Sequence, residues 1–193
     1  MKYILLLLLA VPAFAFEESG PLKYTYLGIS QSKSTGYAAP LSDFTNTGIF
    51  ASTRLTDTLF FGAAIGFGKQ DVGSISATVT EYDLMLGGRS PINEQIDATL
   101  SVSLASANVS IGSNSYSGTG NVISLGVRGM IIPSVEGSAN LNQSSVSING
   151  NSTSQSYLSV GAGIHLNERI QFNLGAGFSK YPSTSIGVLF YYN

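Results

Sequence analysis

The sequence predicts an all-β protein, an antiparallel up-and-down transmembrane β-barrel with ten strands, or with eight if weak strands merge. Three observations support this fold class. Apolar and polar residues alternate in several long segments, tight turns alternate with longer loops, and only 10% of the 193 residues are charged. An ordinary soluble domain contains about 25% charged residues, so an exterior facing only water is not favoured.

The alternation has a strict period of two in residues 59–69, 95–106, 157–166 and 170–180. In the first segment, apolar residues at odd positions from Leu59 to Phe67 alternate with residues that are mostly Gly or Ala. Period two is typical of a strand with one apolar face. These segments exceed the roughly five to six residues of most soluble strands and match the about 9–11 residues with which a tilted strand crosses a bilayer.

Tight turns mark where neighbouring strands meet. Residues 56–59, 93–96 and 167–170 share one form, in which a polar, an acidic, a polar and an aliphatic residue follow one another. A fourth tight connection falls at Pro133 and Ser134. Extending outward from these turns predicts strands at residues 22–31, 43–55, 59–70, 75–89, 95–107, 119–131, 134–143, 154–166, 170–180 and 184–193.

The other connections are rich in Ser, Asn, Gly and Thr, and they are often longer than the tight turns with which they alternate. They fall near residues 32–42, 71–74, 108–118, 144–153 and 181–183. Barrels of the outer membrane have short turns on the periplasmic side and longer loops outside the cell. We therefore expect the tight turns, and both chain termini, on the periplasmic side.

The N-terminus has the pattern of a signal peptide at residues 1–15. Lys2 supplies a positive charge, residues 4–10 are apolar, and Ala13 to Ala15 fits a cleavage site with small residues. The apolar run is well below the about 20 residues of a spanning helix. The mature chain is then expected to be a single barrel domain of residues 16–193.

The mature chain resembles the small bacterial outer-membrane β-barrel proteins of the OmpA and OmpX type, which are porin-like in architecture. The resemblance rests on the strand-turn units at residues 54–59 and 165–170 and on the C-terminal strand at residues 186–193. It implies a location in the bacterial outer membrane, with membrane lipid and the outer-membrane assembly machinery as partners. The machinery would read the C-terminal strand, which here carries Phe190, Tyr191 and Tyr192 before Asn193. The oligomeric state stays open.

The phase of the alternation places most aliphatic residues on the outside of the barrel. It also places several aromatic residues there, which would form girdles at the two membrane surfaces. These aromatic residues are Phe61, Phe67, Tyr82, Phe172, Phe178, Phe190 and Tyr192. The inward residues are mostly Gly, Ser, Thr and Asn. The inward charged residues are Arg54, Glu81, Asp83, Arg89, Asp97, Arg128 and Glu136.

Most inward charges lie close to the tight turns, which predicts a charged layer at the periplasmic mouth. The layer would consist of Arg54, Arg89, Asp97, Arg128, Glu136 and His165, with Arg89–Asp97 and Arg128–Glu136 as ion pairs. The layer is either a structural network, since buried charges need partners, or the gate of a narrow pore. We favour the network, because small barrels fill their interiors with side chains. Glu81 and Asp83 lie further from the turns, and Glu81 is about 26 Å along the strand from Arg89.

Composition argues against other classes of function. Nine Lys and Arg residues against eleven Asp and Glu give no basic excess for nucleic-acid binding. Without cysteine there is no thiol nucleophile or thiolate metal site, and the single histidine, His165, is expected to be a hydrogen-bonded lumen residue. We therefore expect no enzyme activity, cofactor or metal. The predicted role is structural or that of a narrow passive pore. The alternatives are an adhesin displaying short polar loops and a secreted soluble barrel that binds a ligand as lipocalins do.

Overall fold

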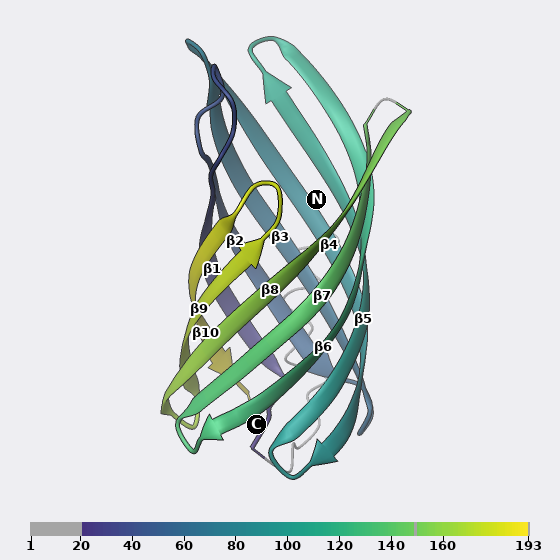
Figure 1. Cartoon of the computed structure of the whole chain (residues 1–193), viewed down its shortest axis with the longest axis vertical. Helices are drawn as coiled ribbons and strands as arrows, with labels where there is room; N and C mark the ends of the chain where they lie inside the picture. Colours follow the sequence, from purple (N-terminus) through teal and green to yellow (C-terminus); the bar gives the residue numbers. More distant parts are fainter. Residues whose placement is uncertain (1–20, 149, 193) are drawn as a thin grey trace.

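The computed structural model describes residues 21–148 and 150–192, apart from the side chain of Val72. Within these residues, ten antiparallel strands form one closed barrel in which each strand pairs with the next and β1 pairs with β10 (Figure 1). The prediction of ten strands is therefore confirmed and the alternative of eight is wrong. The expected signal peptide and cleavage site lie outside the described residues. The described part of the chain contains no helix long and apolar enough to cross a membrane.

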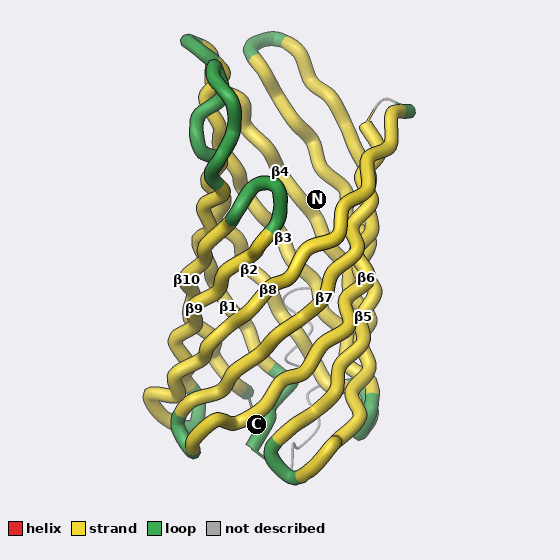
Figure 2. The backbone as a smooth tube through the Cα atoms, viewed as in Figure 1, coloured by secondary structure: helices red, strands yellow, loops and turns green. Residues whose placement is uncertain are grey.

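The strands are β1 (Tyr26–Ser34), β2 (Phe44–Arg54), β3 (Leu59–Val72), β4 (Ile75–Asn93), β5 (Ile96–Ile111), β6 (Asn114–Ile132), β7 (Val135–Ile148), β8 (Asn151–Asn167), β9 (Ile170–Phe178) and β10 (Ser183–Tyr191). Tight turns join them at one end, which we call the base (Figure 2). The opposite end is the outer end. The hairpins reach unequal heights there: β8 begins at Asn151, but its ladder with β9 begins only at Leu158.

The sequence-based boundaries differ most from the structure in two places, and β1 and β4 also run further than expected, to Ser34 and Asn93. Residues 22–25 do not belong to β1; they precede it, and Leu22, Tyr24 and Thr25 are 1–4% exposed. The loops expected at residues 108–118 and 144–153 are instead strands that continue into tight hairpins. Gly112 and Gly150 adopt positive φ angles in these turns, a conformation that glycine reaches without steric cost.

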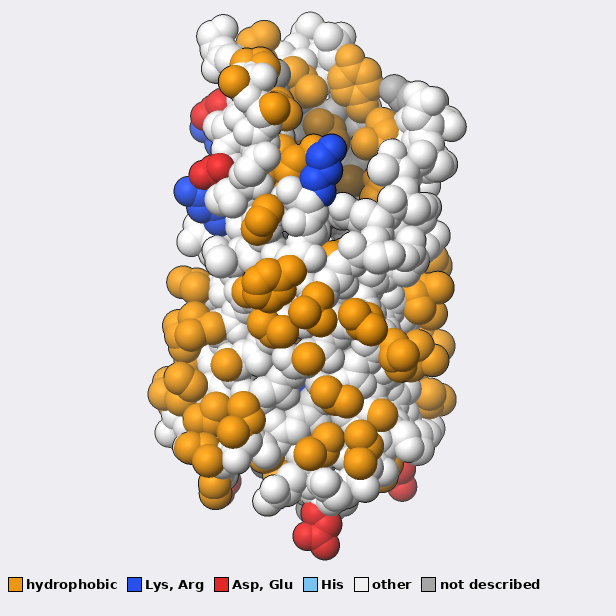
Figure 3. Space-filling model, in the orientation of Figure 1, with side chains coloured by type: hydrophobic (Ala, Val, Ile, Leu, Met, Phe, Trp, Pro, Cys, Tyr) orange, Lys and Arg blue, Asp and Glu red, His pale blue; other side chains and the backbone are white. Residues whose placement is uncertain are grey.

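An apolar belt surrounds the barrel from its base to a sharp outer edge. Every strand contributes an exposed residue at this edge, namely Ile29, Ile49, Phe67, Leu84, Leu104, Ile123, Leu141, Leu158, Phe178 and Ile186. The space-filling view shows hydrophobic side chains spread over the lower exterior and mostly polar atoms above them (Figure 3). Of the aromatic residues predicted to face outward, Phe67, Phe178, Phe190 and Tyr192 are exposed, whereas Phe61, Tyr82 and Phe172 are partly covered by neighbours.

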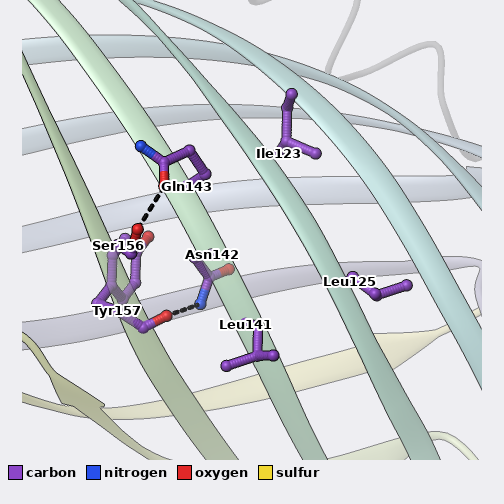
Figure 4. A pocket seen from close by; sticks show the side chains of 7 residues that line it. All are labelled: Ile123, Leu125, Leu141, Asn142, Gln143, Ser156 and Tyr157. Atoms are coloured by element: carbon purple, nitrogen blue, oxygen red, sulfur yellow. Dashed lines mark hydrogen bonds between the residues drawn. The ribbon is translucent and has the colours of Figure 1, made fainter.

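Figure 4 shows one stretch of the belt's outer edge, at an apolar hollow over β6, β7 and β8. Leu125 and Leu141 pair across β6 and β7, and both are exposed. Two residues further along β7, the side chain of Gln143 accepts a hydrogen bond from the Ser156 hydroxyl of β8. These two polar side chains thus bond to each other directly beside the apolar residues that end the belt.

Candidate functional site

The base of the barrel carries the charged side chains that the alternation assigns to the lumen. Arg89 lies on β4 and Asp97 on β5, Arg128 on β6 and Glu136 on β7. The antiparallel ladder of β5 and β6 places Asp97 opposite Arg128. Residues that are opposite in an antiparallel pair point to the same face. Arg89 and Glu136 lie on the same face, each one diagonal step from Asp97 and Arg128 respectively.

The structure brings both predicted ion pairs together. The Arg89 Nη1 atom lies 3.0 Å from Asp97 Oδ2. Arg128 binds Glu136 with two hydrogen bonds, from Nε at 2.6 Å and from Nη2 at 2.9 Å. Asp97 and Glu136 are only 3% and 7% exposed. Buried carboxylates need such partners, and the bidentate geometry makes the second pair the stronger kind.

Tyr24 joins the two ion pairs. Its hydroxyl donates a hydrogen bond to Asp97 Oδ2 over 2.8 Å. The centre of its ring lies 4.6 Å from the guanidinium carbon of Arg128 and 5.3 Å from that of Arg89, within the range of cation–π interactions. The ring also packs on Phe60 of β3, with 4.9 Å between ring centres. Sequence reasoning missed this role, because it placed Tyr24 inside an expected strand of residues 22–31, whereas β1 begins only at Tyr26.

Arg54 and His165 lie at the same level but contribute differently. The Arg54 side chain binds Asp57 and the Thr56 carbonyl oxygen in the turn that follows it, so it closes its own turn. His165 Nε2 is 3.8 Å from Glu136 Oε2, and its ring stacks near Tyr191 with 5.9 Å between centres. Tyr191 in turn donates a hydrogen bond to Gln171, which is 1% exposed.

The structure keeps Glu81 and Asp83 apart from the charged layer. Both lie on β4 toward the outer end, and among the described residues neither is within 4.0 Å of a Lys, Arg or His nitrogen. Glu81 accepts a hydrogen bond of 3.0 Å from the Asn46 amide. Across the described residues, no group of three or more His, Cys, Asp or Glu side chains could hold a metal ion.

A family model described as outer membrane protein beta-barrel domain matches residues 3–187. The chain belongs to this family. The family match agrees with the apolar belt, and it places the barrel in the bacterial outer membrane, as expected. A soluble ligand-binding barrel does not fit either finding, since such a barrel would expose its belt to water.

Several solved structures share the barrel of this outer-membrane protein. The translocator domain of the autotransporter NalP from Neisseria meningitidis is 11% identical, with a TM-score of 0.50 over 99% of this chain and 95% of that one. The β domain of the Bordetella autotransporter BrkA is 10% identical, with a TM-score of 0.59 over 88% and 100%. An outer-membrane channel from Pseudomonas putida F1 is 13% identical, with a TM-score of 0.51 over 92% and 97%. These identities show a common fold alone. No curated protein sequence matches the chain.

Proposed function

We propose that the barrel is closed to ion flow at its base and has a structural role in the outer membrane. The observation that carries this proposal is the position of Tyr24 between two buried ion pairs. Tyr24 donates a hydrogen bond to Asp97, and its ring packs on the guanidinium groups of Arg89 and Arg128. An open pore would have left the faces of these guanidinium groups to water. If the same layer were a gate, the barrel would be a narrow pore. The experiment below distinguishes a closed base from a gated pore.

Side chains from nearly every strand contribute to this level of the lumen. Arg54, Phe60, Arg89, Asp97, Arg128, Glu136, His165, Gln171 and Tyr191 come from β2 to β10 in order. Tyr191 donates a hydrogen bond to Gln171 and its ring stacks near His165, which continues the layer to β8, β9 and β10. The carboxylates of both ion pairs accept hydrogen bonds from arginine side chains, which occupies them with structural contacts. We accordingly propose that the protein is not an enzyme.

Planar-bilayer recordings of the refolded protein test the closed base. We expect no conductance steps from the wild-type barrel and clear steps from Tyr24→Ala, because this substitution removes the ring that packs between the guanidinium groups. Tyr116→Ala is the matched control, since Tyr116 is 39% exposed and lies near the outer end of β6. Steady wild-type conductance that Tyr24→Ala leaves unchanged would refute the closed base.

We further propose that β10 serves as the strand recognised by the outer-membrane assembly machinery, while lipid contacts the apolar belt. Phe190 and Tyr192 are 42% and 38% exposed, so aromatic rings at the end of the chain are presented on the surface. Replacing both with Ser should lower the amount of barrel in isolated outer membranes, whereas Tyr116→Ser should not. Equal amounts in the three cases would contradict this proposal. The adhesin alternative stays a prediction of the sequence.

A further inference from the structure

On β5 and β7 the polarity of the barrel wall inverts above the outer edge of the belt. On β5 the outward residues there are Ser106, Asn108 and Ser110, and on β7 they are Gln143, Ser145 and Ser147. Apart from the buried Ser144, the inward residues of the same segments are apolar: Ala105, Ala107, Val109, Val146 and Ile148. Figure 3 shows hydrophobic side chains inside the opening at the outer end, where the exterior is mostly polar. We call this inward apolar wall the outer cup.

The outer cup leaves apolar side chains uncovered. Val146 is 46% exposed and Ile148 is 41% exposed, although both face the lumen. Water against apolar surface costs about 25 cal/mol for each Å². The middle of the lumen avoids this cost with polar residues such as Ser124 and Asn142, which bond to each other. An apolar wall at the outer end is therefore a surface to which a ligand with an apolar body could bind.

A cavity of about 200 Å³ lies in this wall, and two cross-strand rows define its floor. One row runs from Glu81 through Ala107 and Gly118 to Ile148, and the other from Asp83 through Ala105 and Gly120 to Val146. Each row thus has a carboxylate at the β4 end, small residues in the middle and a branched aliphatic residue at the β7 end.

The glycines keep the floor of the cavity low. A Cβ atom at Gly118 would lie 2.9 Å from Cγ1 of Ile148, and one at Gly120 would lie 2.8 Å from the Ser145 carbonyl oxygen. Neither glycine can therefore be replaced by a larger residue without a shift of the facing atoms of β7. Three interstrand steps separate β4 from β7, a span of about 14 Å, which limits the length of any bound molecule.

The β4 end of the cavity has an excess of hydrogen-bond acceptors. Among the described residues, no cationic nitrogen lies within 4.0 Å of Glu81 or Asp83. Asn46 donates to Glu81, and the Oδ1 atom of the same amide is buried without a hydrogen-bond partner. Glu81 and Asp83 both line the cavity, and two carboxylates at the edge of an apolar wall favour a donor that carries positive charge.

We propose that the outer cup binds small amphipathic monocations, with an ammonium head at Glu81 and Asp83 and an apolar body against Val146 and Ile148. The volume is below the about 300–1,000 Å³ of sites for drug-sized ligands, so the body is of the size of one aromatic ring or a short alkyl chain. This binding is independent of whether the base conducts ions.

Isothermal titration calorimetry tests the proposal: the full-length barrel in nanodiscs is titrated with 2-phenylethylammonium, and empty nanodiscs serve as the blank. We expect saturable binding of the amine and at least about tenfold weaker binding of 2-phenylethanol, which lacks the charge. The double variant Glu81→Gln/Asp83→Asn should lose at least about tenfold in affinity for the amine, equivalent to about 1.4 kcal/mol. The Gln side chain still accepts the hydrogen bond from Asn46.

Two further variants complete the design. Asp71→Asn removes an exposed carboxylate outside the cavity, where the side chain is 53% exposed, and should bind the amine as the wild type does. Ala107→Phe fills the floor between the carboxylates and Ile148 and should abolish binding. Heat-modifiable migration on SDS gels reports whether each variant is folded. Absence of wild-type binding at millimolar amine, equal binding of the alcohol, or unchanged affinity in the folded double variant would overturn the proposal.

Discussion

Replacing Glu136 with Ala would leave the Arg128 guanidinium at the base of the barrel without the carboxylate that accepts two of its hydrogen bonds. These bonds are 2.6 and 2.9 Å long, and the two side chains are 14% and 10% exposed. Removing one partner of a buried ion pair costs about 3–5 kcal/mol, because the remaining charge stays desolvated. We expect Glu136→Ala to lower the free energy of unfolding by this amount.

A double-mutant cycle separates the ion pair from the packing of its members. Arg128→Ala/Glu136→Ala leaves no unpaired charge, so it should destabilise the barrel by less than the sum of the two single substitutions. The expected coupling is about 1–3 kcal/mol. Reversible urea unfolding in phospholipid vesicles, followed by the heat-modifiable band on SDS gels, measures each free energy.

The exposed pair Lys33–Asp43 is the matched control for this cycle. Its atoms approach to 2.8 Å, close to the distances in the buried pair, but its side chains are 54% and 42% exposed. Exposed pairs contribute about 0–1 kcal/mol, so its coupling should be much smaller. Additive effects at Arg128 and Glu136, or equal couplings for the two pairs, would refute the view that burial gives the layer its strength.

Three other outcomes follow from the same structure. Tyr24→Phe removes the hydroxyl that donates to Asp97 but keeps the ring, and it should cost about 1.5–3 kcal/mol in the urea assay. Gly87→Ala would place a Cβ atom against the Phe60 ring and should cost about 1–3 kcal/mol, with part of the loss recovered by Phe60→Leu. Burial raises the pKa of Tyr37 above 10.0, so the stability of its loop should be complete below pH 10 and fall as the pH rises. Ultraviolet titration of the wild type against Tyr37→Phe should show this phenol ionising later than a free tyrosine.

Much of the barrel follows from the sequence, because the strands in the membrane have one apolar and one polar face. This is why the alternation at residues 59–69 and 170–180 predicts strands. The phase of Arg89 and Asp97 predicts that both face the lumen, and their closeness to one tight turn predicts a common level. Tyr24 could not be placed in the same way. Its neighbours across the lumen depend on how residues 22–25 fold into the barrel, and no local pattern encodes this.

The extended hairpins show a second limit of the alternation. On β5 the apolar residues occupy even positions up to Leu104 and odd positions from Ala105 to Ile111. The strand continues without a break, but the medium outside changes from lipid to water, so the apolar face changes sides. A search for strands with an apolar outer face alone would take this change of phase for the end of the strand. The alternation itself continues through the change, and this continuity is the signal that could have identified the outer cup.

The unequal hairpins have a consequence for how molecules could reach the outer cup. Residues 151–157 of β8 rise beside a β9–β10 hairpin that is already turning at their level. The wall is therefore lower on this side, immediately above the apolar belt. A molecule dissolved in the headgroup layer would meet this low side before it met the rim. The opening of the barrel thus lies nearer to the apolar belt at β9 and β10 than at the long hairpin of β5 and β6.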